Sequence, residues 1–119
     1  MAVLNRAWYE WEQHVPLLRA SGVSEEYVQH ILHLPPKETG PIKQEQYAVV
    51  LLCTDCMTLD VNVPEHVSQN LKRIFSDREI VEITATIAAY NCVSRFLVAL
   101  DVGERNGQNP VVEQLPERE

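Results

Sequence analysis

The chain is predicted to fold as an all-α bundle of about five helices, as three observations indicate. Apolar residues recur at helical spacing, strand-like alternation is nearly absent, and proline, glycine and capping residues divide the sequence into helix-length pieces. Hydrophobic residues make up 45% of the 119 residues, which is enough apolar side chain for a buried core. The length predicts one helical domain, residues 1–100, followed by a polar tail, residues 101–119.

The first two helices are delimited by proline, glycine and serine. We expect the first helix over about residues 3–20, with Pro16 kinking it or breaking it near Val15. Gly22 ends that unit, and Ser24 caps a second helix whose first turn is acidic, as the helix dipole favours. A loop rich in proline and glycine follows over residues 35–41.

Three further helices are predicted in the rest of the chain. The third, over about residues 43–61, is apolar nearly all round and is therefore expected to be central. Pro64 suits the first helical position of a short fourth helix. Ser76 and Glu79 match a capping box that opens the longest helix, residues 77–100.

The longest helix is apolar on several faces, so we expect it to be buried on most sides. Five helices provide too little surface to cover such faces, which predicts a homo-oligomer assembled through helix faces. The alternative is a compact monomeric bundle with the tail as cover. The tail itself is expected to be either disordered or wrapped on a neighbour through Val111, Val112 and Leu115.

Charge and cysteine content narrow the range of partners and locations. The net charge of −7 argues against nucleic acid and anionic membranes as main partners. The longest uncharged apolar segment, residues 83–94, is shorter than the roughly 20 residues a spanning helix needs. The first residues form no signal peptide. We therefore expect a cytoplasmic protein that acts on a small-molecule substrate and keeps its three cysteines, Cys53, Cys56 and Cys92, reduced.

Glu10 and His14 are the leading candidates for catalysis. They lie four residues apart, and on a helix this spacing puts both side chains on one face. His14 is expected to act as general acid or base, with Glu10 setting its tautomer and charge. Trp8, Tyr9 and Trp11 are expected to form an apolar wall that binds the substrate. The alternative is a solvated pair that stabilises its own helix by a few tenths of a kcal/mol.

Polar residues interrupt the longest helix at Tyr90, Asn91, Ser94 and Arg95. A buried polar group needs a hydrogen-bond partner, so one interpretation is bonding between helices or subunits. The functional interpretation is a pocket lined by Tyr90 and Asn91 in which Arg95 binds a substrate carboxylate.

Cys53 and Cys56 have the spacing of a redox pair. A reactive pair favours a helix N-terminus with a nearby base, whereas these residues fall in the middle of an apolar helix. We therefore expect them to act as small buried hydrophobic residues.

Glu26, His30 and His33 are candidate ligands for a metal ion. Three or four ligands with a second shell are needed, and no fourth group follows before the proline loop. Histidines at a helix C-terminus are favoured by the dipole in any case, so no metal and no organic cofactor is predicted.

Five short motifs follow one another along the chain in a specific order and spacing. They are Tyr9-Glu10-Trp11-x-x-His14-x-Pro16, Gly22-Val23-Ser24-Glu25-Glu26, Asp60-Val61-x-Val63-Pro64, Phe75-Ser76-Asp77-Arg78-Glu79-Ile80-Val81-Glu82 and Tyr90-Asn91-x-Val93-Ser94-Arg95-Phe96-Leu97. Together they resemble the carboxymuconolactone decarboxylase family over roughly residues 5–102. The resemblance implies an all-α, alkylhydroperoxidase-like fold that assembles into trimers or hexamers. It also implies a cofactor-independent enzyme that decarboxylates, or performs a related lyase or isomerase step on, a small or polyketide-like cyclic acid or ketone.

The chain departs from the family at two points. Redox members carry Cys-x-x-Cys-x-x-x-His, and matching on His14 puts Ala7 and Glu10 at the cysteine positions. Peroxidase chemistry is therefore not expected there, and a thiol-dependent peroxidase partner would have to use Cys53 and Cys56. Family members also have an earlier helix with a glutamate of the proton relay, which is not in this sequence. A non-catalytic binding or assembly subunit is thus the main alternative.

Overall fold

The computed structural model describes residues 1–110. Within them the chain forms five α-helices and one short 3₁₀-helix without any strand, which confirms the predicted all-α fold. No described helix is both long enough and apolar enough to span a membrane. The elements are α1 (Trp8–Ala20), α2 (Glu25–His33), α3 (Glu45–Asp60), α4 (Glu65–Ile74), α5 (Asp77–Ala99) and η1 (Val102–Glu104).

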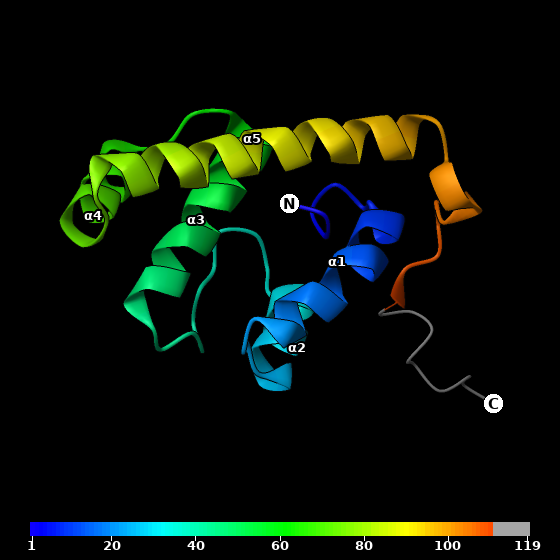
Figure 1. The fold of residues 1–119 in the computed structure, drawn as a ribbon, viewed down its shortest axis with the longest axis horizontal. Coiled ribbons are helices and arrows are strands. Elements are labelled where there is room, and N and C mark those ends of the chain that lie inside the picture. The colour runs from blue at the N-terminus through cyan, green and yellow to red at the C-terminus, as the bar shows by residue number, and fades with distance from the viewer. Residues whose placement is uncertain (111–119) are drawn as a thin grey trace.

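Helix α5 runs the length of the molecule and joins two helix pairs (Figure 1). Helices α3 and α4 pack against each other and against α5, and α1 packs against both α2 and α5. We call these the α3/α4 half and the α1/α2 half. The apolar core cluster belongs to the α3/α4 half and to α5; it comprises Val49, Cys53, Val67, Leu71 and Ile87. The buried apolar residues of the α1/α2 half are Ala7, Trp8, Val15, Val28 and Leu32.

Two serine caps begin helices as predicted. The Ser24 hydroxyl accepts the Tyr27 main-chain N–H at the start of α2. At the start of α5, Ser76 and Glu79 form the complete capping box, each side chain accepting the other residue's main-chain N–H. These bonds satisfy donors that the first turn of a helix leaves free.

Three helix-boundary predictions were wrong in detail. The first helix begins at Trp8 rather than near residue 3, because residues 1–7 form turns and Arg6 adopts a left-handed φ of 53°. Pro16 does not break α1, which continues to Ala20. Pro64 is extended and precedes α4 as its N-cap residue instead of occupying the first helical position.

Within a single chain, α5 is not buried on most sides. Only Ile87 and Ser94 of this helix are buried. Val81 is 67% exposed, Phe96 61% and Leu100 63%. The helix packs along one side only, because no other described element lies over its outer face (Figure 1). Helix α3 does contact both α4 and α5, as its predicted central place requires, although its ends expose Tyr47 and Leu59.

After α5 the chain turns back onto α1. Gly103 has a φ of +73°, and a Cβ at this position would lie 2.5 Å from Cδ2 of Tyr9. Both the left-handed backbone and the close ring therefore require glycine here. Arg105 then pairs with Glu12 at 3.2 Å. Val111, Val112 and Leu115, which the sequence offered as cover for the bundle, lie outside the described residues.

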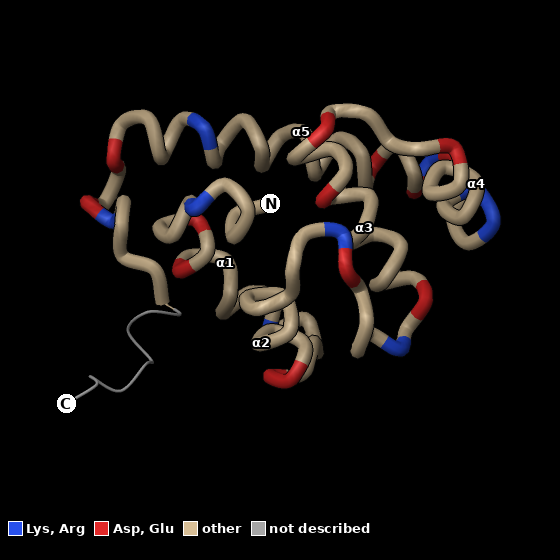
Figure 2. Tube along the Cα trace, turned by 180° about the vertical axis from the view of Figure 1, so that it is seen from behind, with Lys and Arg blue, Asp and Glu red and all other residues tan. Residues whose placement is uncertain are grey.

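Loop 34–44 is tied to α3 by Asp55 and Asp60. The main-chain N–H of Lys37 donates to Oδ2 of Asp55 at 2.9 Å, and the Lys37 ammonium pairs with Asp60. Burial raises the pKa of the Asp55 carboxyl, and the Lys37 N–H partly offsets this by lowering it. Over the described part of the chain, Figure 2 shows acidic and basic residues interspersed, with no patch made of basic residues alone.

Candidate active site

Glu10 is a buried carboxylate that reaches across to α5. It lies in the first turn of α1 with 2% of its surface exposed. The hydroxyl of Ser94, itself fully buried on α5, donates to Oε2 of Glu10. A carboxylate held this far from water needs such a donor, and the bond also links α1 to α5.

His14 lies one turn further along α1 and is oriented by the main chain. Its Nδ1 is 2.8 Å from the carbonyl oxygen of Glu10. A carbonyl oxygen only accepts, so Nδ1 carries the proton in the neutral ring and Nε2 has a free lone pair. Glu10 thus sets the tautomer through its main-chain carbonyl, whereas the sequence predicted that its carboxylate would do so.

Tyr90 of α5 completes this side of the site. Its ring meets the His14 ring edge to face, with centroids 5.0 Å apart and planes at 82°. Contacts of this geometry between aromatic rings are favourable, and they restrict the rotation of the imidazole. The main-chain bond and the ring contact together define one orientation for His14.

Glu10, His14 and Tyr90 line a cavity of about 390 Å³ between α1, α2 and the first residues of the chain. This volume is within the range of small-molecule sites. Apart from those three residues the lining is apolar, and no lysine or arginine side chain takes part. The remaining lining residues are Met1, Ala2, Val3, Trp11, Val15, Leu17, Leu18 and Ile31.

The predicted aromatic wall is divided between different places. Trp11 lines the cavity, and it also lines a smaller one of about 90 Å³ that Trp8 shares with Arg105. Trp8 is buried, and Tyr9 is half-buried with its ring against Gly103. Consecutive residues on a helix point in different directions, so the three aromatic side chains do not form one surface.

Asn91 and Arg95, the other predicted binding residues, do not line the cavity. The Asn91 side chain accepts from Asn5 at 2.9 Å and donates to the Thr58 hydroxyl at 3.1 Å. Asn91 and Ser94 thus bond between elements, as one interpretation of the sequence expected. Arg95 is exposed and makes no ion pair or hydrogen bond within residues 1–110, so its predicted contact with a substrate carboxylate has no support here.

Sequence reasoning missed two parts of the site. The first three residues reach the cavity because turns fold them back, with the Asn5 N–H donating to the Met1 carbonyl at 2.9 Å. Ser94 was noticed as a polar residue on an apolar helix, but its partner on α1 was not identified. The available signal was that a serine buried on an apolar helix needs a hydrogen-bond partner, which a glutamate on another helix can provide.

The paired thiols lie in an environment unsuited to nucleophilic chemistry. Cys53 and Cys56 are buried and unbridged, while Cys92 is exposed. Burial raises the pKa of both the Cys53 and the Cys56 thiol, whereas reactive thiols have lowered values.

The candidate metal ligands are not grouped. His33 bonds through Nδ1 to the Gln29 carbonyl at 2.8 Å, and Nδ1 of His30 is buried without a partner. Across residues 1–110 no three or more histidine, cysteine, aspartate or glutamate side chains are placed to hold a metal ion.

Comparison with known proteins found no relative: the chain matches no protein-family model, no curated protein and no solved structure. Function is therefore argued from the geometry of the site.

Proposed function

We propose that this chain is a cofactor-independent acid–base enzyme of the carboxymuconolactone decarboxylase type, with His14 as the proton carrier. One observation carries the proposal: the His14 ring lines a largely apolar cavity and is held with Nδ1 bonded to the main chain, which leaves Nε2 as the ring nitrogen free to exchange a proton. A positioned imidazole of this kind typically contributes about 10²–10⁴-fold to a proton transfer.

In this proposal Nε2 takes a proton from a carbon next to a carbonyl group and returns it to another atom of the same substrate. The apolar lining excludes water from the enolate that forms in between. Glu10 holds the imidazole through its main-chain carbonyl, which accepts from Nδ1.

The charges of the lining bear on the substrate. Glu10 is the one acidic side chain that lines the cavity, and no basic side chain faces it there except His14 itself. A neutral cyclic ketone therefore fits better than a cyclic acid, because no lysine or arginine side chain lines the cavity to pair with a substrate carboxylate. Of the reactions that the resemblance implies, an isomerase or lyase step on a carbonyl compound fits better than decarboxylation.

A homo-oligomer is part of the same proposal. Exposed apolar residues recur at helical spacing along α5 and at its C-cap; they are Val81, Ala85, Ala88, Ala89, Cys92, Phe96 and Leu100. Exposed apolar stripes of this length mark contact surfaces. Light scattering is expected to give a multiple of 13.6 kDa, three or six copies if the resemblance holds. A monomer at micromolar concentration would refute this part.

A non-catalytic binding subunit is the second candidate, and a specific observation favours it. Beside the His14 cavity lies a larger one of about 580 Å³, with no charged residue in its lining. Such a cavity suits binding, and its lining holds no carboxylate, imidazole or amine side chain for acid–base chemistry.

Hydrogen–deuterium exchange at the carbon next to the carbonyl of small cyclic ketones, followed by mass spectrometry, tests the proposal. His14→Ala is expected to slow exchange at least about 100-fold at unchanged helicity. Glu10→Gln keeps the main-chain carbonyl that holds His14, so it should slow exchange less than His14→Ala does. His66→Ala, an exposed histidine on α4, is the matched control. Equal exchange by the natural chain and the His14 variant, or an equal loss in both histidine variants, would rule out proton transfer by His14.

A further inference from the structure

A second cavity, distinct from the His14 site, lies between α2 and α3. It has a volume of about 580 Å³, and none of its lining residues is charged although charged residues make up 23% of the chain. Its walls are mainly aliphatic and aromatic: Leu18, Val23, Tyr27, Ile31, Ile42, Tyr47, Val50, Leu51, Phe75 and Ile83. The Tyr27 and Tyr47 rings meet edge to face at 6.3 Å on one side of it. This cavity suits an apolar molecule of drug-like size.

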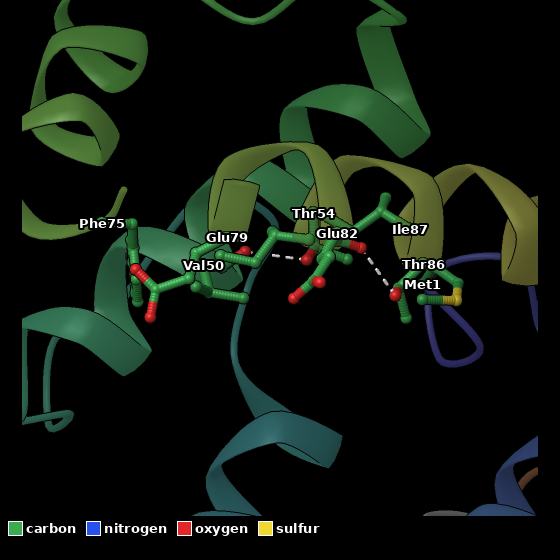
Figure 3. Close-up of a pocket in the computed structure, with 9 residues that line it drawn as sticks. Met1, Val50, Thr54, Phe75, Glu79, Glu82, Thr86 and Ile87 are labelled. Carbon is green, nitrogen blue, oxygen red and sulfur yellow. Dashed lines mark hydrogen bonds between the residues drawn. The ribbon is translucent and has the colours of Figure 1, made fainter. Parts of the chain in front are cut away.

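A third cavity, of about 490 Å³, adjoins it along α5. The two share Val50, Thr54, Phe75 and Ile83 as lining residues, so they lie next to each other. The third cavity adds the carboxylates of Glu79 and Glu82, and Figure 3 shows these beside Val50 and Thr54. No lysine or arginine side chain lines either cavity.

The two carboxylates differ in their surroundings. Glu79 accepts the Ser76 main-chain N–H at 2.8 Å, which lowers its pKa and keeps it ionised at neutral pH. Glu82 pairs with Arg78 at 3.0 Å, but both side chains are largely exposed. An exposed ion pair contributes little free energy, and water readily replaces either partner. Glu82 therefore remains available to another cation.

We propose that these adjoining cavities bind a hydrophobic amine. Its apolar body lies in the uncharged cavity between α2 and α3, and its ammonium group lies toward Glu79 and Glu82. The chemistry decides the headgroup: an ammonium gains from two nearby carboxylates, and an alcohol neither gains nor loses. A carboxylate is repelled by both, and the exposed Arg78 beside Glu82 offsets this only in part. This binding goes beyond the proposed proton transfer, since neither Glu79 nor Glu82 lines the His14 cavity, although Leu18 and Ile31 line both that cavity and the uncharged one.

Three ligands that differ only in headgroup provide the test, namely nonylamine, nonanol and nonanoate. Each displaces the neutral fluorescent probe N-phenyl-1-naphthylamine from the full chain at pH 7 and low salt. Nonylamine is expected to displace the probe at about tenfold lower concentration than nonanoate, with nonanol between them. Added salt should reduce the difference between the displacing concentrations of nonylamine and nonanoate, because salt screens exposed charges.

Three substitutions locate the headgroup. Glu82→Gln should reduce the preference for the amine about threefold, and Arg78→Gln, which removes the competing cation, should increase it. Glu38→Gln, an exposed glutamate of loop 34–44, makes the same charge change elsewhere and should have no effect. Circular dichroism confirms folding of each variant.

Equal binding of amine and acid, or equal effects of Glu82→Gln and Glu38→Gln, would overturn the proposal. Failure of the folded chain to bind the probe would overturn it too, including where copies of the chain cover the cavities in solution. In a His14→Ala variant, nonylamine is expected to displace the probe as it does in the natural chain. A loss of ketone exchange in that variant would therefore leave amine binding intact, and the two proposals can fail independently.

Discussion

The two halves of the molecule are held together by different interactions. In the α3/α4 half an apolar cluster, centred on Cys53, Val67 and Leu71, packs against Ile87 of α5. In the α1/α2 half, the contact with α5 depends on a buried carboxylate that accepts from a buried hydroxyl, Glu10 and Ser94. Asn91 adds further polar bonds to Asn5 and Thr58.

This difference separates stability from function. Apolar packing is non-directional and tolerant of small shifts, whereas a buried polar pair is costly unless its geometry is kept. The polar half is also where His14 and its cavity lie. The α3/α4 half is thus joined to α5 through an apolar cluster, and the proposed chemistry would belong to the half joined to α5 through buried polar bonds.

The largest effect is expected from Leu71→Ala. Leu71 is buried in the core cluster, and removing a buried leucine side chain typically costs about 2–5 kcal/mol of unfolding free energy. Urea unfolding measures the change. Leu59→Ala, at a leucine of α3 that is 47% exposed, is the control and should cost far less. Equal costs at the two positions would show that the cluster is not the core.

A smaller but local effect is expected from Ser94→Ala. The substitution leaves the Glu10 carboxylate buried without its donor, at a cost of about 1–3 kcal/mol. Thr84→Ala on the same helix removes an exposed hydroxyl that bonds only its own helix, and it should be nearly neutral. Hydrogen exchange should show the loss first in α1. If the losses of unfolding free energy caused by Glu10→Gln and Ser94→Ala add up in the double mutant, the hydrogen bond between Ser94 and the Glu10 carboxylate contributes nothing to stability.

The Asp55 carboxyl should destabilise the fold at neutral pH. Burial raises its pKa above the ordinary 3.8, so the folded state binds its proton more tightly. Its contribution to stability is therefore full below the ordinary value and is lost as pH rises through the folded value. Asp55→Asn keeps an acceptor for the Lys37 N–H. It should be more stable than the natural chain at pH 7 and lose that advantage near pH 3. A constant difference across pH would contradict the assignment.

The smallest effect is expected at the surface pair of Arg19 and Glu25, which links α1 to α2. Two hydrogen bonds from Arg19, at 2.7 and 3.0 Å, lower the pKa of Glu25 to about 2. The stabilisation is present above the ordinary pKa of 4.5 and is lost as pH falls through about 2. Thermal unfolding of Glu25→Gln should show a slight loss at pH 7 that disappears in high salt. A loss that persists in high salt would argue for a role other than charge.

Local signals predicted the fold better than they predicted the site. Ser24, Ser76 and Glu79 were identified because capping depends on neighbours within three residues. The left-handed Arg6 has no such signal, so the start of α1 was placed too early. The exposure of Phe96 was missed because an apolar pattern does not show what covers it. In the site, i,i+4 spacing placed Glu10 and His14 on one face, but only tertiary packing gives Glu10 its partner Ser94.

The tautomer of His14 tests the central claim most directly. Long-range ¹H–¹⁵N correlation spectra report which ring nitrogen carries the proton, and His14→Ala assigns the signal among the four histidines. In the neutral ring we expect Nδ1 to be protonated, donating to the Glu10 carbonyl, and Nε2 to be free. A neutral ring protonated mainly on Nε2 would contradict the account, because the base would then have no lone pair at that nitrogen.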